Sequence, residues 1–246
     1  MTARPVSAGR SLPAIAEATP VKRALVLCCA AALTACSTPA QPVSLAAAMT
    51  SPVDIRLTWT GTDPSAAGRI IEFATAADGP WTTLQFMPVR QDSYVHPDLM
   101  PQTSFYYRLR PYYGPASTAV TVTVPGGSAG NDSKDWPSPA TLPGGPAATH
   151  PVRTAAAAAP TDLKAKVLQS NGILFTWTDN AADEEGYLLE DQPAGAADYK
   201  VVAVLDKDIN SFPLITLPDE NTASYRVRAF YYGPPSNVVT RRTGGE

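Results

Sequence analysis

Two stretches of the chain repeat one layout. Residues 55–72 read IRLTWTGTDPSAAGRIIE and residues 173–190 read ILFTWTDNAADEEGYLLE. In each, apolar residues alternate with polar ones up to a tryptophan, Trp59 or Trp177, which is typical of a strand with one buried face. A polar turn and a second apolar run ending on a glutamate follow. We therefore expect a chain built from two copies of one β domain.

The spacing between the copies is constant over most of their length. A separation of 118 residues holds without a gap for the pairs Trp59 and Trp177, Glu72 and Glu190, and Tyr107 and Tyr225. It becomes 119 at residues 112–115 and 231–234, which both read YYGP, so the second copy carries one extra residue near Phe230. The length of 246 residues allows one or two domains, and the repeat indicates two.

Several motifs in the two copies resemble those of the fibronectin type III family. They are Gly-aromatic-x-apolar-Glu at 186–190, Leu-x-Pro-x-Thr at 99–103, Tyr-Arg-apolar-Arg at 107–110 and 225–228, and Gly-Pro-x-Ser at 114–117 and 233–236. The resemblance covers residues 41–124 and 160–243. It implies an all-β chain of two tandem immunoglobulin-like, seven-stranded β-sandwiches, with Trp59 and Trp177 in equivalent cores and each domain folding independently.

The first 35 residues resemble a bacterial lipoprotein signal peptide, with a start near residue 21 as an alternative. Lys22 and Arg23 precede an apolar run too short to span a bilayer, and Leu-Thr-Ala-Cys at 33–36 resembles a lipobox. This predicts lipidation of Cys36 and anchoring to a membrane, followed by a short tether at 36–40. The competing interpretation is a buried helix that ends on a cysteine.

Residues 125–159, between the two copies, are rich in Pro, Gly and Ala and show little apolar periodicity. This composition predicts a flexible, semi-extended linker. Its Trp136 is either a recognition anchor or a contact with one of the sandwiches.

Catalytic constellations are not evident in the sequence. The two histidines, His96 and His150, are poorly placed to share a site, and no metal-ligand spacing of His or Cys is present. An acidic turn of Asp179, Asp183, Glu184 and Glu185 allows either a calcium site or a solvated turn. We therefore expect no enzyme activity, no metal and no cofactor.

The paired tyrosines of the YYGP segments are the best candidates for recognition. Tyrosine offers a large contact area at low entropic cost, so Tyr112, Tyr113, Tyr231 and Tyr232 are candidate partner-binding residues. Alternatively, one ring of each pair caps the core and the other shields a sheet edge.

The formal net charge of −3 and the lack of a basic stripe argue against nucleic acid as a partner. The sequence favours a non-catalytic, lipid-anchored cell-envelope protein that acts as a spacer and protein-interaction module in a surface or secretion assembly. Ser37 after the lipidated cysteine resembles an outer-membrane address of a Gram-negative bacterium. The alternative is a glycan-binding accessory module at the cell surface.

Overall fold

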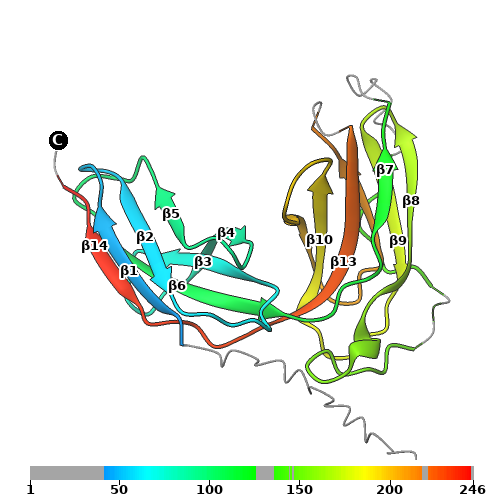
Figure 1. Cartoon of the computed structure of the whole chain (residues 1–246), viewed down its shortest axis with the longest axis horizontal. Coiled ribbons are helices and arrows are strands. Elements are labelled where there is room, and N and C mark those ends of the chain that lie inside the picture. The colour runs from blue at the N-terminus through cyan, green and yellow to red at the C-terminus, as the bar shows by residue number, and fades with distance from the viewer. Residues whose placement is uncertain (1–41, 126–135, 144, 146, 218–220, 245–246) are drawn as a thin grey trace, which may run out of the picture. The chain divides into compact units, whose positions relative to one another are not determined.

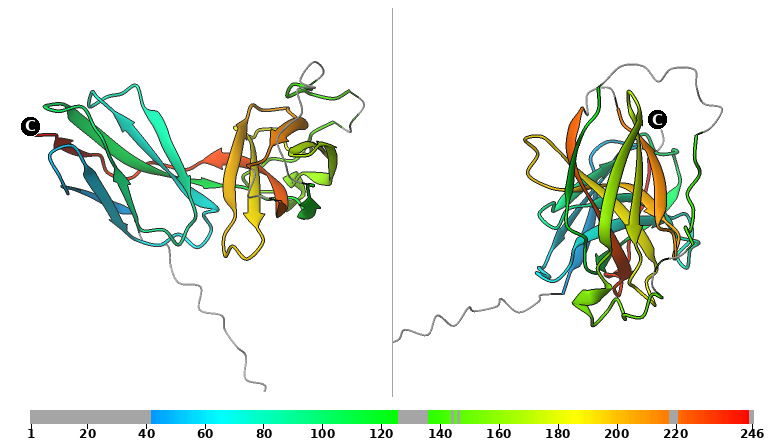
Figure 2. Two further views of the ribbon diagram at one scale, coloured as in Figure 1. Left: turned by 90° about the horizontal axis from the view of Figure 1, so that it is seen from above. Right: turned by 90° about the vertical axis from the view of Figure 1, so that its right-hand side faces the viewer.

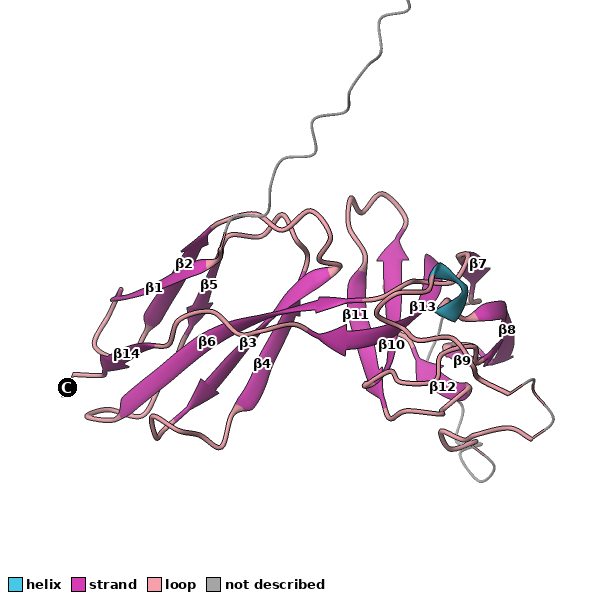
Figure 3. Cartoon of the chain, turned by 90° about the horizontal axis from the view of Figure 1, so that it is seen from below, coloured by secondary structure: helices cyan, strands magenta, loops and turns pink. Residues whose placement is uncertain are grey.

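The alternating stretches of both repeats fold as strands with one buried face. Strand β2 (Ile55–Thr60) buries Ile55, Leu57 and Trp59 and exposes the residues between them. The computed structural model describes residues 42–125, 136–143, 145, 147–217 and 221–244, and the predicted signal peptide and tether, with Cys36, lie outside them. Within these ranges the chain is almost entirely strand and loop (Figure 3). The expected all-β fold of two tandem sandwiches is confirmed.

Seven strands come from each repeat. Those of the first repeat are β1 (Ser44–Met49), β2 (Ile55–Thr60), β3 (Gly68–Ala74), β4 (Thr82–Met87), β5 (Ser93–His96), β6 (Ser104–Tyr113) and β7 (Val120–Thr123). Those of the second are β8 (Thr161–Gln169), β9 (Gly172–Thr178), β10 (Gly186–Pro193), β11 (Lys200–Leu205), β12 (Ser211–Ile215), β13 (Thr222–Tyr232) and β14 (Val239–Arg242). A short 3-10 turn, η2 (Ala156–Ala158), precedes β8.

The strands form three sheets. Two three-stranded sheets have the orders β1-β2-β5 and β12-β9-β8. The third has the order β11-β10-β13-β6-β3-β4, with β14 also paired to β6 and β7 also paired to β13. It therefore runs through both repeats and supplies the second layer of each sandwich.

The last strand of each repeat belongs to the sandwich of the other repeat. Strand β7 pairs with β13, and β14 pairs with β6. In Figure 1 the green β7 lies beside the orange β13, and in Figure 2 the red end of the chain lies among blue and cyan strands. The first sandwich thus consists of β1–β6 with β14, and the second of β7–β13. The predicted boundaries, 41–124 and 160–243, assign each last strand to its own repeat, and the pairing reverses that assignment.

The hydrophobic cores follow the exchanged strands. Trp59 is 5% exposed in the first core and Trp177 is 4% exposed in the second, as expected. Val122 and Val124 of the first repeat are buried in the second core, whereas Val239 of the second repeat packs against the first. Each sandwich therefore completes its core with side chains from the other repeat.

The described part of the linker packs on the second sandwich. Val152 and Ala158 are buried in its core, and Ala140 forms a β-bridge with Ser211. The ring of Trp136 covers Gly172 of the second repeat. Of the two alternatives for Trp136, a recognition anchor or a contact with a sandwich, the structure has the contact. The described residues between 136 and 159 therefore do not form the expected flexible linker, because Val152 and Ala158 have buried positions that composition alone does not reveal.

The described residues all fall in one compact unit of the chain, Thr38–Glu246. In the described ranges, no helix has the length and apolar character needed to cross a membrane.

Candidate functional site

The four candidate tyrosines meet where β6 and β13 pair. Tyr113 lies opposite Tyr231, and Tyr112 lies opposite Tyr232, in an antiparallel ladder. In a sandwich that kept its own last strand, these residues would lead into a hairpin loop. Here they extend both strands, so we call these four residues the tyrosine junction.

Tyr112 is a core residue. It is 3% exposed and packs with Ile70, Leu188 and Phe230, which come from both repeats. A side chain at Gly68 would collide with its hydroxyl group, so glycine is needed there. Burial raises the pKa of Tyr112. The structure corrects the expectation of a partner contact for this residue, because its ring offers almost no surface.

Tyr113 and Tyr231 stack on each other, with ring centroids 5.3 Å apart and an interplanar angle of 20°. The hydroxyl of Tyr113 donates a hydrogen bond of 2.6 Å to Oδ2 of Asp63. Burial acts to raise the pKa of Asp63, but hydrogen bonds from Ser65 and Tyr113 outweigh it and lower that pKa. The guanidinium of Arg153 lies 4.3 Å from the ring centroid of Tyr231. Both rings are therefore held by contacts within the chain.

Tyr232 is half-buried. Its ring meets Phe230 edge to face with centroids 5.1 Å apart, and the guanidinium of Arg110 lies 5.1 Å from its centroid. Burial, and then the charge of Glu72, raise its pKa. For Tyr113, Tyr231 and Tyr232, the role in partner binding stays a prediction.

Glycines allow the chain to cross between the sandwiches beside the junction. Gly114 has a φ of 122°, and a Cβ there would lie 2.0 Å from the carbonyl oxygen of Ala229. A Cβ at Gly233 would lie 2.5 Å from the ring of Tyr113. The Gly-Pro steps thus serve close backbone passage at the crossing.

A buried ion pair supports the crossing from the second repeat. Glu190 is 2% exposed and accepts hydrogen bonds from Arg226 and Arg228. Arg228 also donates a hydrogen bond of 2.6 Å to the carbonyl oxygen of Gly114. Glu72 pairs with Arg108 and Arg110 in the first repeat. Sequence reasoning missed these pairs, although the Tyr-Arg-apolar-Arg motif and the glutamate that closes each apolar run were a signal for them.

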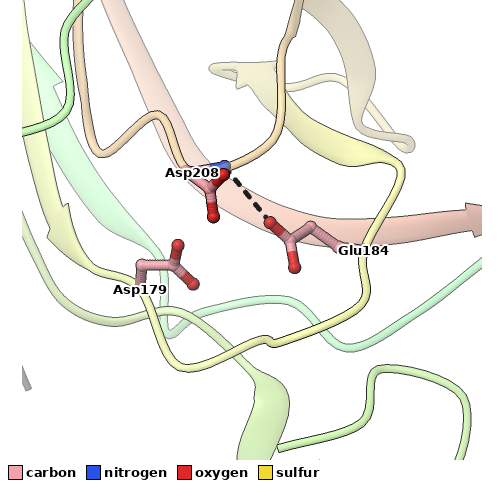
Figure 4. A group of neighbouring side chains, drawn as sticks. All are labelled: Asp179, Glu184 and Asp208. Atoms are coloured by element: carbon pink, nitrogen blue, oxygen red, sulfur yellow. Dashed lines mark hydrogen bonds between the residues drawn. The ribbon is translucent and has the colours of Figure 1, made fainter. Parts of the chain in front are cut away.

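Three carboxylates gather at one end of the second sandwich (Figure 4). The side chains of Asp179, Glu184 and Asp208 offer oxygens within 4.8 Å of one another. Tyr187 donates a hydrogen bond to Asp179, and the backbone N–H of Asp208 donates one to Glu184. Burial raises the pKa of Asp179 and of Glu184.

The acidic residues predicted to form a turn at 179–185 differ from one another in burial and in their partners. Glu184 is buried rather than solvated, and Asp183 accepts a hydrogen bond from the backbone N–H of Val152. Asp208 joins from the loop after β11, a position for which the sequence carried no signal. Burial, and to a smaller extent like charge, disfavours the charged forms of Asp179 and Glu184.

The two histidines have separate surroundings. Nδ1 of His96 lies 3.0 Å from the hydroxyl of Tyr107 in the first sandwich, and burial lowers the pKa of His96. His150 forms a β-bridge with Ala181 of the second repeat. The described residues do not bring the two rings into one site.

The architecture defines a tandem pair of immunoglobulin-like sandwiches that are joined by strand exchange. No family model matches the chain, and no curated protein matches it. Among solved structures it is similar to a two-domain fibronectin type III segment of chicken tenascin, with 12% identity, coverage of 84% of this chain and 100% of that one, and a TM-score of 0.27. It is also similar to the FN1–FN3 domains of chicken CNTN1, with 20% identity, coverage of 83% and 66%, and a TM-score of 0.27.

Proposed function

We propose that the protein is a non-catalytic, lipid-anchored component of the cell envelope that acts as a spacer and as a protein-interaction module. The observation that carries this proposal is the reciprocal exchange of β7 and β14. Two sandwiches that share strands act as one mechanical unit, whereas sandwiches on a flexible linker do not.

Contacts beside the exchanged strands support a spacer. Arg90 of the first repeat donates a hydrogen bond of 3.1 Å from Nε to Asp198 of the second repeat. Ile70 and Tyr112 share a buried cluster with Leu188 and Phe230. Bending at the junction would break the ladder of the tyrosine junction and open this cluster, so we expect the unit to keep its length under load.

An exposed apolar strand supports the interaction role. Among the described strands, β11 pairs only with β10, so it ends the sheet. Val202 and Val204 on this strand are 37% and 51% exposed. A sheet edge with exposed valines suits a partner that adds a strand, since backbone hydrogen bonds supply affinity and the valines supply an apolar contact.

The lipobox at residues 33–36 supports the anchor, and Ser37 supports an outer-membrane address in a Gram-negative bacterium. The multiple acyl chains of a bacterial lipoprotein would hold the chain firmly to the membrane. We expect its partner to be another protein of the cell envelope.

The glycan-binding alternative needs open aromatic faces on which sugars stack. Tyr113 and Tyr231 stack on each other, and Arg153 lies over the ring of Tyr231. These contacts occupy the rings that the alternative would use, and so the tyrosine junction favours the protein-interaction role.

The anchor is tested by replacing Cys36 with alanine. Because the thiol is the group that takes the lipid, we expect the variant to leave the membrane fraction or to accumulate unprocessed, with loss of label from a radioactive fatty acid. Cys29→Ala is the matched control and should fractionate like the wild type. Unchanged membrane retention of the Cys36→Ala protein would contradict the anchor.

The interaction role is tested by crosslinked capture from intact envelopes. Val204→Lys places a charge on the exposed face of β11, and we expect it to reduce capture of the partner at least tenfold while the melting temperature holds. Val95→Lys is the control, because Val95 is 39% exposed on a strand of the first sandwich. Equal capture by both variants would show that β11 is not the contact, and capture of no protein by the wild type would reject the interaction role.

A further inference from the structure

The two exchanged strands sit in identical registers. Thr121 lies opposite Ser224, and Thr240 lies opposite Tyr106. Thr121 and Thr240 are equivalent in the repeat, and so are Ser224 and Tyr106. The remaining pairs of both ladders correspond in the same way. Each acceptor strand therefore receives the partner repeat's last strand in the register in which it would receive its own.

The hydrogen bonds that anchor the exchanged strands are also equivalent. The backbone N–H of Ser117 donates to the carbonyl oxygen of Val227, and the N–H of Ser236 donates to that of Leu109, at 2.8 and 2.7 Å. The hydroxyls of the same two serines accept from the N–H groups of Val227 and Leu109, at 3.1 and 3.0 Å. These contacts depend on the repeat motif and not on which chain supplies the strand.

The segments that lead into the last strands hold the crossing conformation. They begin with Gly114-Pro115 and Gly233-Pro234-Pro235. Proline has a fixed φ and disfavours helical backbone in the residue before it, so these segments resist folding back into a tight hairpin. A crossing segment of this kind delivers its strand to a neighbouring sandwich.

We propose that two copies of this chain exchange last strands with each other, so that the first repeat of one copy and the second repeat of the other complete a pair of sandwiches. In such a dimer, β14 of each copy pairs with β6 of the other, and β7 of each copy pairs with β13 of the other. The tyrosine junction and both serine anchors are kept. The packing of the described linker residues on β8–β13 of their own copy is kept as well.

The exchange closes after two copies. When each copy donates its β7 and β14 to the other copy and accepts the same two strands from it, the dimer has twofold symmetry and leaves neither of these strands unpaired. The covalent connection between the two repeats sets the equilibrium between the single chain and the dimer. It gives each repeat an effective concentration in the millimolar range near the other repeat of the same chain. The single chain therefore dominates in dilute solution, and the dimer forms when the chain folds at comparable concentration.

Single cysteines detect the exchange between copies. Residues directly opposite each other in an antiparallel pair have Cα atoms about 4.5–5.5 Å apart, which suits a disulfide. The full chain, with Cys28, Cys29 and Cys36 replaced by serine, is made as Tyr106→Cys and as Thr240→Cys. The two proteins are mixed, refolded together from denaturant at about 1 mM or about 0.01 mM, and oxidised with a mild oxidant.

We expect a covalent dimer on a non-reducing gel after refolding at the higher concentration, and a roughly hundredfold smaller share at the lower one. The control mixture is Ser224→Cys with Thr240→Cys, which are opposite only if β14 pairs with its own repeat. It should give little dimer.

Light scattering on the refolded wild-type chain provides a readout without introduced cysteines and should show twice the monomer mass in the concentrated sample. A monomer at both concentrations would overturn the proposal. So would equal covalent dimer from the control mixture, because that outcome reports collision rather than exchange.

Discussion

At the scale of single residues, buried carboxyl groups have two opposite environments in this molecule. Glu190 is surrounded by two arginines, so its carboxylate has opposite charges and hydrogen bonds at close range. Asp179 and Glu184 instead lie near Asp208, and burial together with this like charge raises the pKa of both acids. Opposite charge favours an ionised carboxylate, whereas burial and like charge favour its protonated form.

The raised pKa values make the stability of the second sandwich depend on pH. The folded state holds protons on Asp179 and Glu184 at pH values where the unfolded chain, with ordinary pKa values near 4, has released them. Unfolding then releases protons, so the free energy of unfolding falls as pH rises through the interval between the ordinary and the raised pKa. The acid cluster therefore destabilises the fold at neutral pH.

We expect Asp208→Asn to raise the melting temperature at pH 7 by about 1–3 °C, because it removes a negative charge beside two buried acids. Asn tolerates the positive φ of 63° at this position and keeps the backbone N–H that bonds Glu184. The gain should vanish below about pH 4, where Asp179 and Glu184 are protonated. Asp206→Asn in the same loop is the control, and an equal effect of the two variants on thermal melts would contradict the assignment.

At the scale of secondary-structure elements, the two exchanged strands are held unequally. Strand β7 buries Val122 and is followed by the buried Val124, whereas β14 has one half-buried residue and three exposed ones. The end of β14 is fastened by Thr243, which is 3% exposed and whose hydroxyl donates to Met100 and accepts from Thr103. Hydrogen bonds therefore hold β14 in the first sandwich with less apolar burial than holds β7 in the second.

At the scale of the whole molecule, strand exchange couples the stability of the two sandwiches. Loss of the second repeat's structure would remove β14 from the first sandwich, and loss of the first repeat's structure would remove β7 from the second. The sequence suggested domains that fold independently. The shared strands and the buried cluster across the junction predict cooperative unfolding instead.

Trp177→Ala tests this coupling. Truncating the buried indole should cost roughly 3–5 kcal/mol, a large part of the stability of a domain. We expect calorimetry to show one transition for the wild type and one, at lower temperature, for the variant. Trp81→Ala, which removes a half-exposed ring, should shift the transition much less. If the variant instead melts in two steps, with one step at the wild-type temperature, the sandwiches are not coupled.

Much of the local structure could be predicted from the sequence, because it depends on neighbouring residues. The alternation around Trp59 and Trp177 specifies strands with one buried face, and the repeat specifies two sandwiches of equivalent core. The pairing of Glu190 with Arg226 and Arg228 could also have been predicted, since the Tyr-Arg-apolar-Arg motif and the preceding glutamate recur in both repeats.

The tertiary structure alone decided which sandwich receives each last strand. Both repeats present the same motif, register and serine anchor, so local preferences are equal for a strand's own acceptor and for the other one. The same holds for Asp208, which meets Asp179 only through the fold, and for Val152 and Ala158, whose burial depends on a surface formed by distant strands. Local sequence determines what each segment can pair with, but the choice among equivalent partners depends on the crossing segments and on the contacts made at the tyrosine junction.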